Sequence, residues 1–302
     1  MLTVLQTALE VGLIYGLVAL ALFISFSILN IADLSTDGCF TLGCAVGAML
    51  TIAGHPILAL FAAMAAGMLS GYVTAFLQTR LGVESILAGI ISNTGLYTIN
   101  LAVMGFSSNV SITGVDTVFS LFKGLVGGQW SRLILLALIA AVLVLVLIRF
   151  FGTSLGLSIR ATGDSLDMVS ASSINPKATI TIGLCLANAL TALSGCLIGE
   201  YNKFCDINLG TGMVVIGLAS LIIGETLFGR GGMWVKAVAA VAGSVIYRFI
   251  IALALRANVP SECLKLISAI IVALAIAAPA LRAKAAFRRR RAHAGKEAAR
   301  HA

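Results

Sequence analysis

The chain has 302 residues, of which 60% are hydrophobic and only 11% are charged, and its mean hydropathy is +1.07. A soluble domain carries about a quarter charged residues, so this composition excludes a water-soluble globular protein and indicates an α-helical membrane protein. The formal net charge is +8. Most of it lies in the last 21 residues, where eight basic side chains face a single acidic one, Glu297.

Long apolar segments follow one another along the chain. A helix that crosses a bilayer needs about 20 apolar residues. We therefore expect an all-α polytopic membrane protein with about nine transmembrane helices, in a range of eight to ten. The second and seventh segments are short and Gly-rich at their starts, so they are expected to be broken or re-entrant. The nine predicted spans are residues 5–27, 38–53, 57–79, 83–104, 131–150, 177–199, 211–228, 235–256 and 263–281.

The sidedness of the spans follows from Lys and Arg, which favour the cytoplasmic face. The chain divides into a transmembrane domain, residues 1–281, and a basic tail, residues 282–302. A basic tail directly after an apolar segment indicates a cytoplasmic anchor beside anionic headgroups, and not a nucleic-acid site. Counting back, loop 151–176 is inside and loop 105–130 is outside. Nine spans put the N-terminus outside, and one further span in the first half would put it inside.

Two polar breaks interrupt the apolar pattern, at residues 28–38 and 200–212. Each follows a long helix and precedes a short one, which is the pattern of an inverted repeat whose broken helices flank a transport path. The N-termini of the short helices, with hydroxyls such as Thr211, offer donors to a polar solute, and Asp33 and Asp37 suit a cationic group such as an α-amine. Ordinary capping and loop roles remain an alternative. The residues expected to line the path are Asn30, Asp33, Ser35, Thr36, Asp37, Asn93, Asn100, Asn188, Asp206 and Asn208.

Other polar residues also fall within spans. Asparagines there hold helices together more often than they bind substrate. Glu10, Glu225 and Arg248 are ionisable, so each needs a cavity or a partner inside the membrane. For Arg248, the sequence does not name that partner.

Loop 151–176 is the only sizeable polar cytoplasmic segment between two spans. A plain connection needs only a few residues. After an extended entry, Asp164 or Ser165 can cap a short helix with an apolar edge at Leu166, Met168 and Val169. Asn175 can cap the next span, with Pro176 at its first position. A solvated connection and a docking element are both compatible with this pattern, and we favour the docking element.

Three motifs resemble one known family. They are Ser158-Ile159-Arg160-Ala161-Thr162-Gly163-Asp164 with Met168 and Ile174-Asn175, then Asn30 to Gly38 with Phe40 to Gly43, and Gly217 to Ser220 leading to Glu225. They are similar to ABC importer permeases of the branched-chain amino acid and ribose permease superfamily. The resemblance covers roughly residues 10–280, and it is strongest to a branch of uncharacterised or tryptophan-type amino acid import permeases.

This resemblance implies that the chain is a permease subunit and not an enzyme. In such families the cytoplasmic loop docks into a groove on an ATP-hydrolysing subunit, which binds ATP and Mg²⁺. The resemblance further implies an extracytoplasmic solute-binding protein, a homodimer in the bacterial inner membrane, and an amino acid as cargo, with aromatic ones favoured. By resemblance, the coupling residues are Arg160, Ala161, Thr162, Gly163, Asp164, Met168, Ile174 and Asn175.

The sequence motifs agree with a permease subunit whose ATPase is a separate chain. No G-x-x-x-x-G-K-[ST] phosphate loop occurs in the sequence, so no cofactor is expected on this chain. The three histidines (His55, His293 and His301) lie off the spans, which argues against an intramembrane protease. The cysteines form no CxxC pair or Cys/His cluster, so no metal site is expected. A secondary transporter or channel that works without an ATPase remains the alternative.

Overall fold

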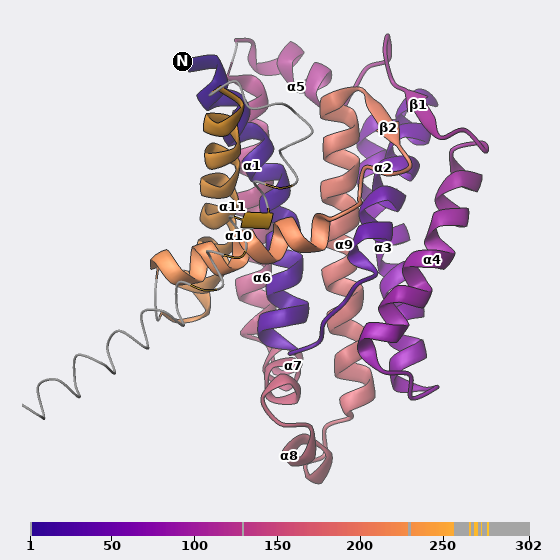
Figure 1. Cartoon of the computed structure of the whole chain (residues 1–302), viewed down its shortest axis with the longest axis vertical. Helices are drawn as coiled ribbons and strands as arrows, with labels where there is room; N and C mark the ends of the chain where they lie inside the picture. The colour runs from indigo at the N-terminus through magenta and orange to yellow at the C-terminus, as the bar shows by residue number, and fades with distance from the viewer. Residues whose placement is uncertain are drawn as a thin grey trace, which may run out of the picture.

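The computed structural model is a bundle of helices with a small helical hairpin at one end and a two-stranded ribbon at the other (Figure 1). It describes residues 2–128, 130–228 and 231–256, together with Leu266, Ala269, Ile270, Ala273 and Ala277. Apart from these five residues, the predicted ninth span, 263–281, and the basic tail, 282–302, lie outside the described part of the chain.

The elements follow one another in the order that the apolar segments predict, with additions in the loops. They are α1 (Leu2–Leu22), the π-helix η1 (Phe23–Ile28), α2 (Thr36–Ile52), α3 (Pro56–Thr79), α4 (Ser85–Val103), β1 (Asn109–Ser111), α5 (Val118–Val126), α6 (Ser131–Phe151), α7 (Ser154–Asp164), α8 (Leu166–Ala171), α9 (Pro176–Asn202), β2 (Phe204–Asp206), α10 (Met213–Phe228) and α11 (Met233–Arg256).

In the described part of the chain, six helices are long and apolar enough to cross a membrane, namely α1 with η1, α3, α4, α6, α9 and α11. The short apolar helices α2 and α10 coincide with the two predicted short spans. A mainly helical polytopic membrane protein is therefore confirmed, whereas the number of nine crossings is not.

Helices α1 and α9 form the centre of the bundle. Within their most apolar stretches, 78% and 83% of the residues are buried, against 28–33% in α3, α4, α6 and α11. Helix α9 packs most extensively against α3 and α2. The backbones approach closely because small residues face one another: a Cβ on Gly67 or Gly71 of α3 would overlap backbone carbonyls of α9. Small residues within segments 67–71 and 187–194 make this close packing possible.

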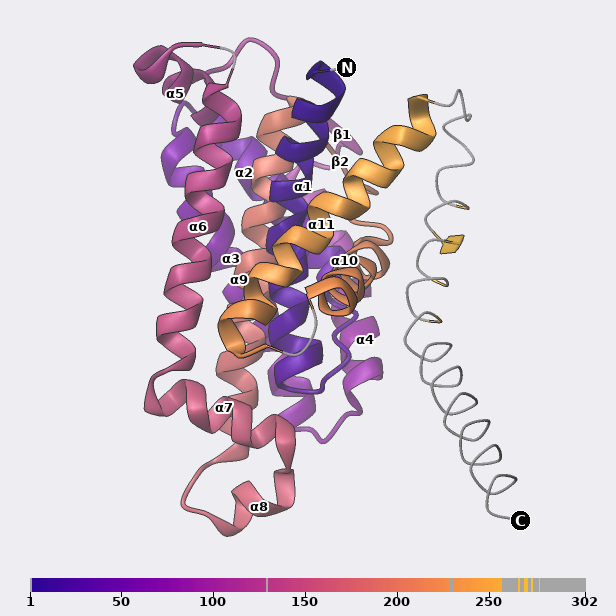
Figure 2. The ribbon, with the colours of Figure 1, turned by 90° about the vertical axis from the view of Figure 1, so that its left-hand side faces the viewer.

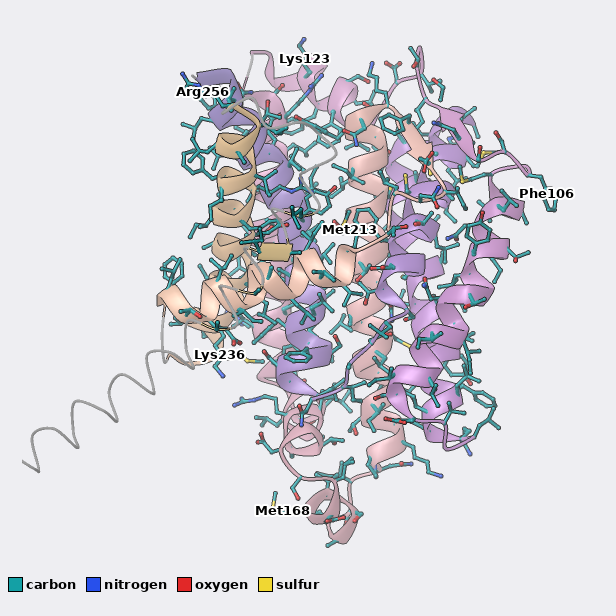
Figure 3. The ribbon with its side chains drawn as sticks, in the orientation of Figure 1. Phe106, Lys123, Met168, Met213, Lys236 and Arg256 are labelled. Atoms are coloured by element: carbon teal, nitrogen blue, oxygen red, sulfur yellow. The ribbon has the colours of Figure 1, made fainter. Side chains whose placement is uncertain are left out.

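The two short helices begin inside the bundle and not at its ends. The chain after η1 runs from the end that carries α7 and α8 back toward the start of α2, while the chain after β2 approaches from the opposite end (Figure 1). Met213, at the start of α10, lies about halfway between Lys123 at one end and Met168 at the other (Figure 3). Helix α10 then runs across the bundle, and it is seen nearly end-on in Figure 2. The two breaks thus enter from opposite ends, as the inverted-repeat pattern requires.

Three local elements differ from the sequence expectations. Strands β1 and β2 pair antiparallel, with Val110 opposite Cys205, and join two loops in which the sequence predicted no strand. Helix α5 forms within loop 105–130. The extended entry expected before α8 is wrong, since residues 154–164 form helix α7. The Thr153 side chain accepts the Gly156 N–H at 3.3 Å, which satisfies a free donor of the first turn and allows the helix to begin there.

Candidate functional site

The first polar break is held in place by Asp33, which is buried. Its Oδ1 accepts the backbone N–H of Ser35 at 2.8 Å and the Ser35 hydroxyl at 2.6 Å. Its Oδ2 accepts the Asn188 side-chain amide of α9 at 2.9 Å. Since a buried carboxylate needs such donors, these bonds fix the segment before α2 against the central helix α9. Thr36 adds a bond from its hydroxyl to the Asp33 carbonyl at 3.1 Å.

Asp37, one turn further along, joins the two breaks. Its carboxylate oxygens accept the N–H groups of Gly212 and Val214 at 2.9 Å each. These donors belong to the start of α10, where a helix has no internal acceptors for its first N–H groups. Asp37 itself lies in the first turn of α2, so its charge faces the positive ends of both short helices. Thr41 adds a bond from the Gly210 N–H to its hydroxyl oxygen at 3.1 Å.

A pocket of about 320 Å³ opens at this meeting point, and we call it the junction pocket. It contains the predicted path residues Asp37, Asn93, Asn100 and Asn208, together with Thr211. Sequence reasoning missed Tyr97, although its spacing from Asn93 and Asn100 places all three on one side of α4. The pocket is lined by Asp37, Gly38, Thr41, Asn93, Thr94, Tyr97, Asn100, Ile207, Asn208 and Thr211.

The other predicted path residues lie elsewhere. Ser35, Thr36 and Asn188 are buried around Asp33, behind the pocket. Asp206 is in β2, where its Oδ1 accepts the Asn208 N–H at 2.8 Å. Asn30 has a left-handed backbone (φ 56°) and lies at the opposite end of the first break, beside α7. The predicted set is therefore divided between the junction pocket, its supporting network and the two ends of the breaks.

The α7–α8 hairpin (residues 154–171) projects beyond the bundle at one end (Figures 1 and 2). Ser165 ends α7 and begins α8, since its side chain accepts the Met168 N–H at 3.3 Å. Val169 is buried and anchors α8, whereas Leu166 and Met168 are 55% and 60% exposed. The predicted cap of the following helix is confirmed, because Asn175 accepts the Lys177 N–H at 3.1 Å.

The hairpin contacts the start of the first polar break. The hydroxyls of Thr162 in α7 and Thr179 in α9 lie 2.8 Å apart. Gly163 lies directly on η1, where a Cβ would overlap the carbonyl of Ile28. A second pocket, of about 260 Å³, lies here between Asn30 and the end of α7. Of the predicted coupling residues, Arg160, Asp164, Met168 and Asn175 are exposed, Thr162 is buried, and Ala161, Gly163 and Ile174 are half-buried.

Each of the three ionisable residues that the sequence identified inside the spans contacts another described residue. The Arg248 guanidinium lies 3.7 Å from the centre of the Tyr15 ring, a cation–π contact that the sequence did not identify. Glu10 accepts hydrogen bonds from the Gln6 amide and the Tyr201 hydroxyl, at 2.9 Å each. Glu225 accepts the Ser27 hydroxyl at 2.9 Å. These contacts stabilise helix packing and involve no residue of the junction pocket.

Known proteins are similar to this chain over most of its length. A family described as "Branched-chain amino acid transport system / permease component" matches residues 4–278. A tyrosine transport system permease protein of Clostridioides difficile (strain R20291) is 36% identical over 262 residues, 86% of each chain. An uncharacterized protein of Rickettsia prowazekii (strain Madrid E) is 36% identical over 225 residues, 74% of this chain and 78% of the relative. No solved structure matches the chain significantly. The chain therefore belongs to the family of branched-chain amino acid transport system permease components.

Proposed function

We propose that this chain is the transmembrane permease subunit of an ATP-binding-cassette importer that moves an amino acid into the cytoplasm by alternating access. The α7–α8 hairpin is the observation that supports this proposal best. It projects from the bundle with Leu166 and Met168 exposed, while Val169 fixes it from below. Two exposed apolar side chains on an anchored helical hairpin suit an apolar groove on a protein partner, because docking removes their surface from water.

The expected assembly follows from the family. Two ATPase subunits would bind ATP and Mg²⁺ and contact the hairpins of two copies of this chain. A solute-binding protein would deliver the cargo at the end that carries α5, β1 and β2. The hairpin would face the cytoplasm of a bacterium, on the same side of the inner membrane as the basic tail. A role in amino acid transport is supported by the family and by the tyrosine transport relative, and aromatic amino acids are the favoured cargo.

The contacts suggest how movement of the hairpin would reach the transport path. Gly163 lies against the carbonyl of Ile28, the last residue of η1. A π-helical turn is a common site of functional adjustment within a helix. From η1 the chain continues through Asn30 to Asp33 and Asp37, which hold the starts of α2 and α10. A shift of the hairpin would therefore reach the junction through η1 and the first polar break, and it would also act on α9 through the contact between Thr162 and Thr179.

The ATPase partner can be tested directly. The full chain is co-expressed with its candidate ATPase and solute-binding protein, purified, and assayed for ATPase association and ATP-dependent uptake in liposomes. The double variant Leu166→Ser/Met168→Ser should insert and fold normally but lose ATPase association. Phe106→Ser is the matched control, because Phe106 is 74% exposed at the opposite end of the bundle (Figure 3).

Two outcomes contradict the importer proposal. In the first, the purified chain transports solute in liposomes without any ATPase, as a secondary transporter or channel would. In the second, the double variant associates with the ATPase as well as the wild type does.

A further inference from the structure

We infer that the junction pocket binds the primary ammonium group of the cargo, with the side-chain oxygens of Asn100 and Asn93 as acceptors beside the Asp37 carboxylate. This inference rests on the proposed function in taking the cargo to be an amino acid. It goes further by naming the part of the amino acid that the pocket selects and the residues that select it.

Asn100 provides the first observation. The residue is 2% exposed, and its Nδ2 donates to the carbonyl of Gly38 at 3.0 Å. A carbonyl can only accept, so the amide group must face Gly38 with its NH₂ and present its oxygen on the other side. That oxygen has no hydrogen-bond partner among the described residues. A buried acceptor without a donor is unfavourable. Asn100 is among the residues that line the pocket, and although its oxygen is itself buried, a ligand that carries a donor would remove this cost.

Asn93 lies on the same side of α4, two turns earlier. Its side chain lines the pocket and makes no hydrogen bond to any described residue. Its Oδ1 lies close to Gly38, since a Cβ on that glycine would be 2.6 Å from it. Both amide oxygens therefore lie beside the first turn of α2.

Several donors around the pocket are already engaged within the protein. Thr41 donates its hydroxyl proton to the Asp37 carbonyl at 3.3 Å, and Thr94 donates to the Ile90 carbonyl at 2.9 Å. The N–H groups at the start of α10, which would suit an anion, are taken by the Asp37 carboxylate. The hydroxyl protons of these two threonines and the N–H groups of the α10 start are thus engaged within the protein.

The charge of the pocket points the same way. Asp37 is the one charged residue among those that line it, and no Lys, Arg or His lies among them. A carboxylate ligand would meet the like charge of Asp37 without a compensating cation, whereas an ammonium group gains from it. Tyr97, which is 53% exposed, adds an aromatic face that suits either a cation or an aromatic side chain. The volume, about 320 Å³, lies at the lower end of the range for small-ligand pockets, roughly 300–1,000 Å³, and fits one amino acid.

Three related probes separate the two charged groups of an amino acid. L-Tryptophan carries both groups, tryptamine keeps the ammonium without the carboxylate, and indole-3-propionate keeps the carboxylate without the ammonium. Saturation-transfer NMR with the full chain in lipid nanodiscs detects weak binding of each compound and gives its Kd by titration. We expect L-tryptophan and tryptamine to bind with similar affinity and indole-3-propionate to bind at least about 10-fold more weakly.

Two substitutions locate the site. Asn100→Leu removes the unpartnered oxygen and should weaken the binding of tryptamine by about 10-fold or more, as expected for a hydrogen bond to a charged group. Asn93→Leu should weaken it less, and because it breaks no internal hydrogen bond, it tests the site even if Asn100→Leu misfolds. Thr98→Leu is the matched control, since Thr98 is exposed on α4 and does not line the pocket.

The inference is overturned if indole-3-propionate binds as well as tryptamine, if no probe binds the wild type, or if both asparagine variants bind tryptamine with the wild-type Kd. Its failure is distinct from failure of the proposed function. If the asparagine variants bind the probes like the wild type and also show normal ATPase association and uptake, only the ammonium site is contradicted. If the probes bind as expected but the chain never associates with an ATPase, only the importer proposal is contradicted.

Discussion

The α7–α8 hairpin and the junction of α2 with α10 place their functional groups in opposite ways. In the hairpin, apolar side chains are exposed to solvent, and Val169 is the buried anchor. At the junction, the Asp37 carboxylate lies inside the bundle, where backbone N–H groups from a distant segment satisfy it. Under the proposed function, junction residues would contribute to folding as well as to transport, whereas exposed hairpin residues would contribute to partner binding alone. Substitutions in the two regions should therefore separate stability from assembly.

The largest effect on stability is expected for Asp37→Ala. It leaves the N–H groups of Gly212 and Val214 without their acceptor at the start of α10. Since each buried donor left unsatisfied costs about 1–3 kcal/mol, the loss should be about 3 kcal/mol for this partly buried pair. Thermal or SDS-induced unfolding of the purified chain measures it. Asp206→Ala, which removes the acceptor of one N–H in an exposed turn, is the comparison, and an equal loss in the two variants would contradict the special role of Asp37.

A somewhat smaller effect is expected for Gly163→Ala, which tests the link between the two regions. The added methyl group would overlap the Ile28 carbonyl, so α7 must move away from η1. Such overpacking costs about 1–3 kcal/mol. Uptake should fall more than ATPase association does, because the docking surface at Leu166 and Met168 is retained. Gly95→Ala is the control, since a Cβ there meets open space and should leave stability unchanged or raise it by about 0.5–1 kcal/mol. Wild-type uptake by Gly163→Ala would rule out transmission through this contact.

Tyr15→Leu should have a still smaller effect, and one outside both regions. It removes the ring that lies 3.7 Å from the Arg248 guanidinium and that also stacks on Phe40, with ring centroids 6.0 Å apart. A partly desolvated cation–π contact contributes about 1–2 kcal/mol, which is the loss expected in the unfolding assay. Tyr15→Phe keeps the ring and should remain close to the wild type. If Phe and Leu were equally destabilising, the hydroxyl and not the ring would be the important group.

Residue patterns within single segments were enough to predict much of this fold. Eight of the nine predicted spans coincide with helices, because apolar runs of suitable length report directly on burial in a bilayer. A cap at Asp164 or Ser165 and a cap at Asn175 were predicted because a side-chain oxygen before a helix has a local role that spacing reveals, and the structure selects Ser165 for the first. The two polar breaks were also identified by composition, before any contact between them was known.

Contacts between distant segments could not be predicted from the sequence. The bonds from Gly212 and Val214 to Asp37 use backbone donors, which every residue except proline has, so no residue type marks them. Strands of three residues, such as β1 and β2, are too short for an alternating pattern to show. Tyr97 was missed for a related reason. An aromatic residue in an apolar helix looks like packing until the helix is seen to border a polar pocket.

The smallest effect on stability is expected for Met168→Ala. This variant separates partner binding from stability most clearly. Met168 is 60% exposed, so its truncation should change the free energy of unfolding by less than about 0.5 kcal/mol. Its neighbour Val169 is 1% exposed, and Val169→Ala should cost about 1 kcal/mol of unfolding free energy.

ATPase affinity should show the reverse order, with a larger loss for Met168→Ala than for Val169→Ala. An apolar side chain that becomes buried at an interface contributes about 1.5–3 kcal/mol, so Met168→Ala should weaken ATPase binding by about 10-fold or more. Pull-down titration with the purified ATPase measures this. If Met168→Ala lost stability and kept its ATPase affinity, the side chain would belong to the fold of the hairpin and not to its docking surface.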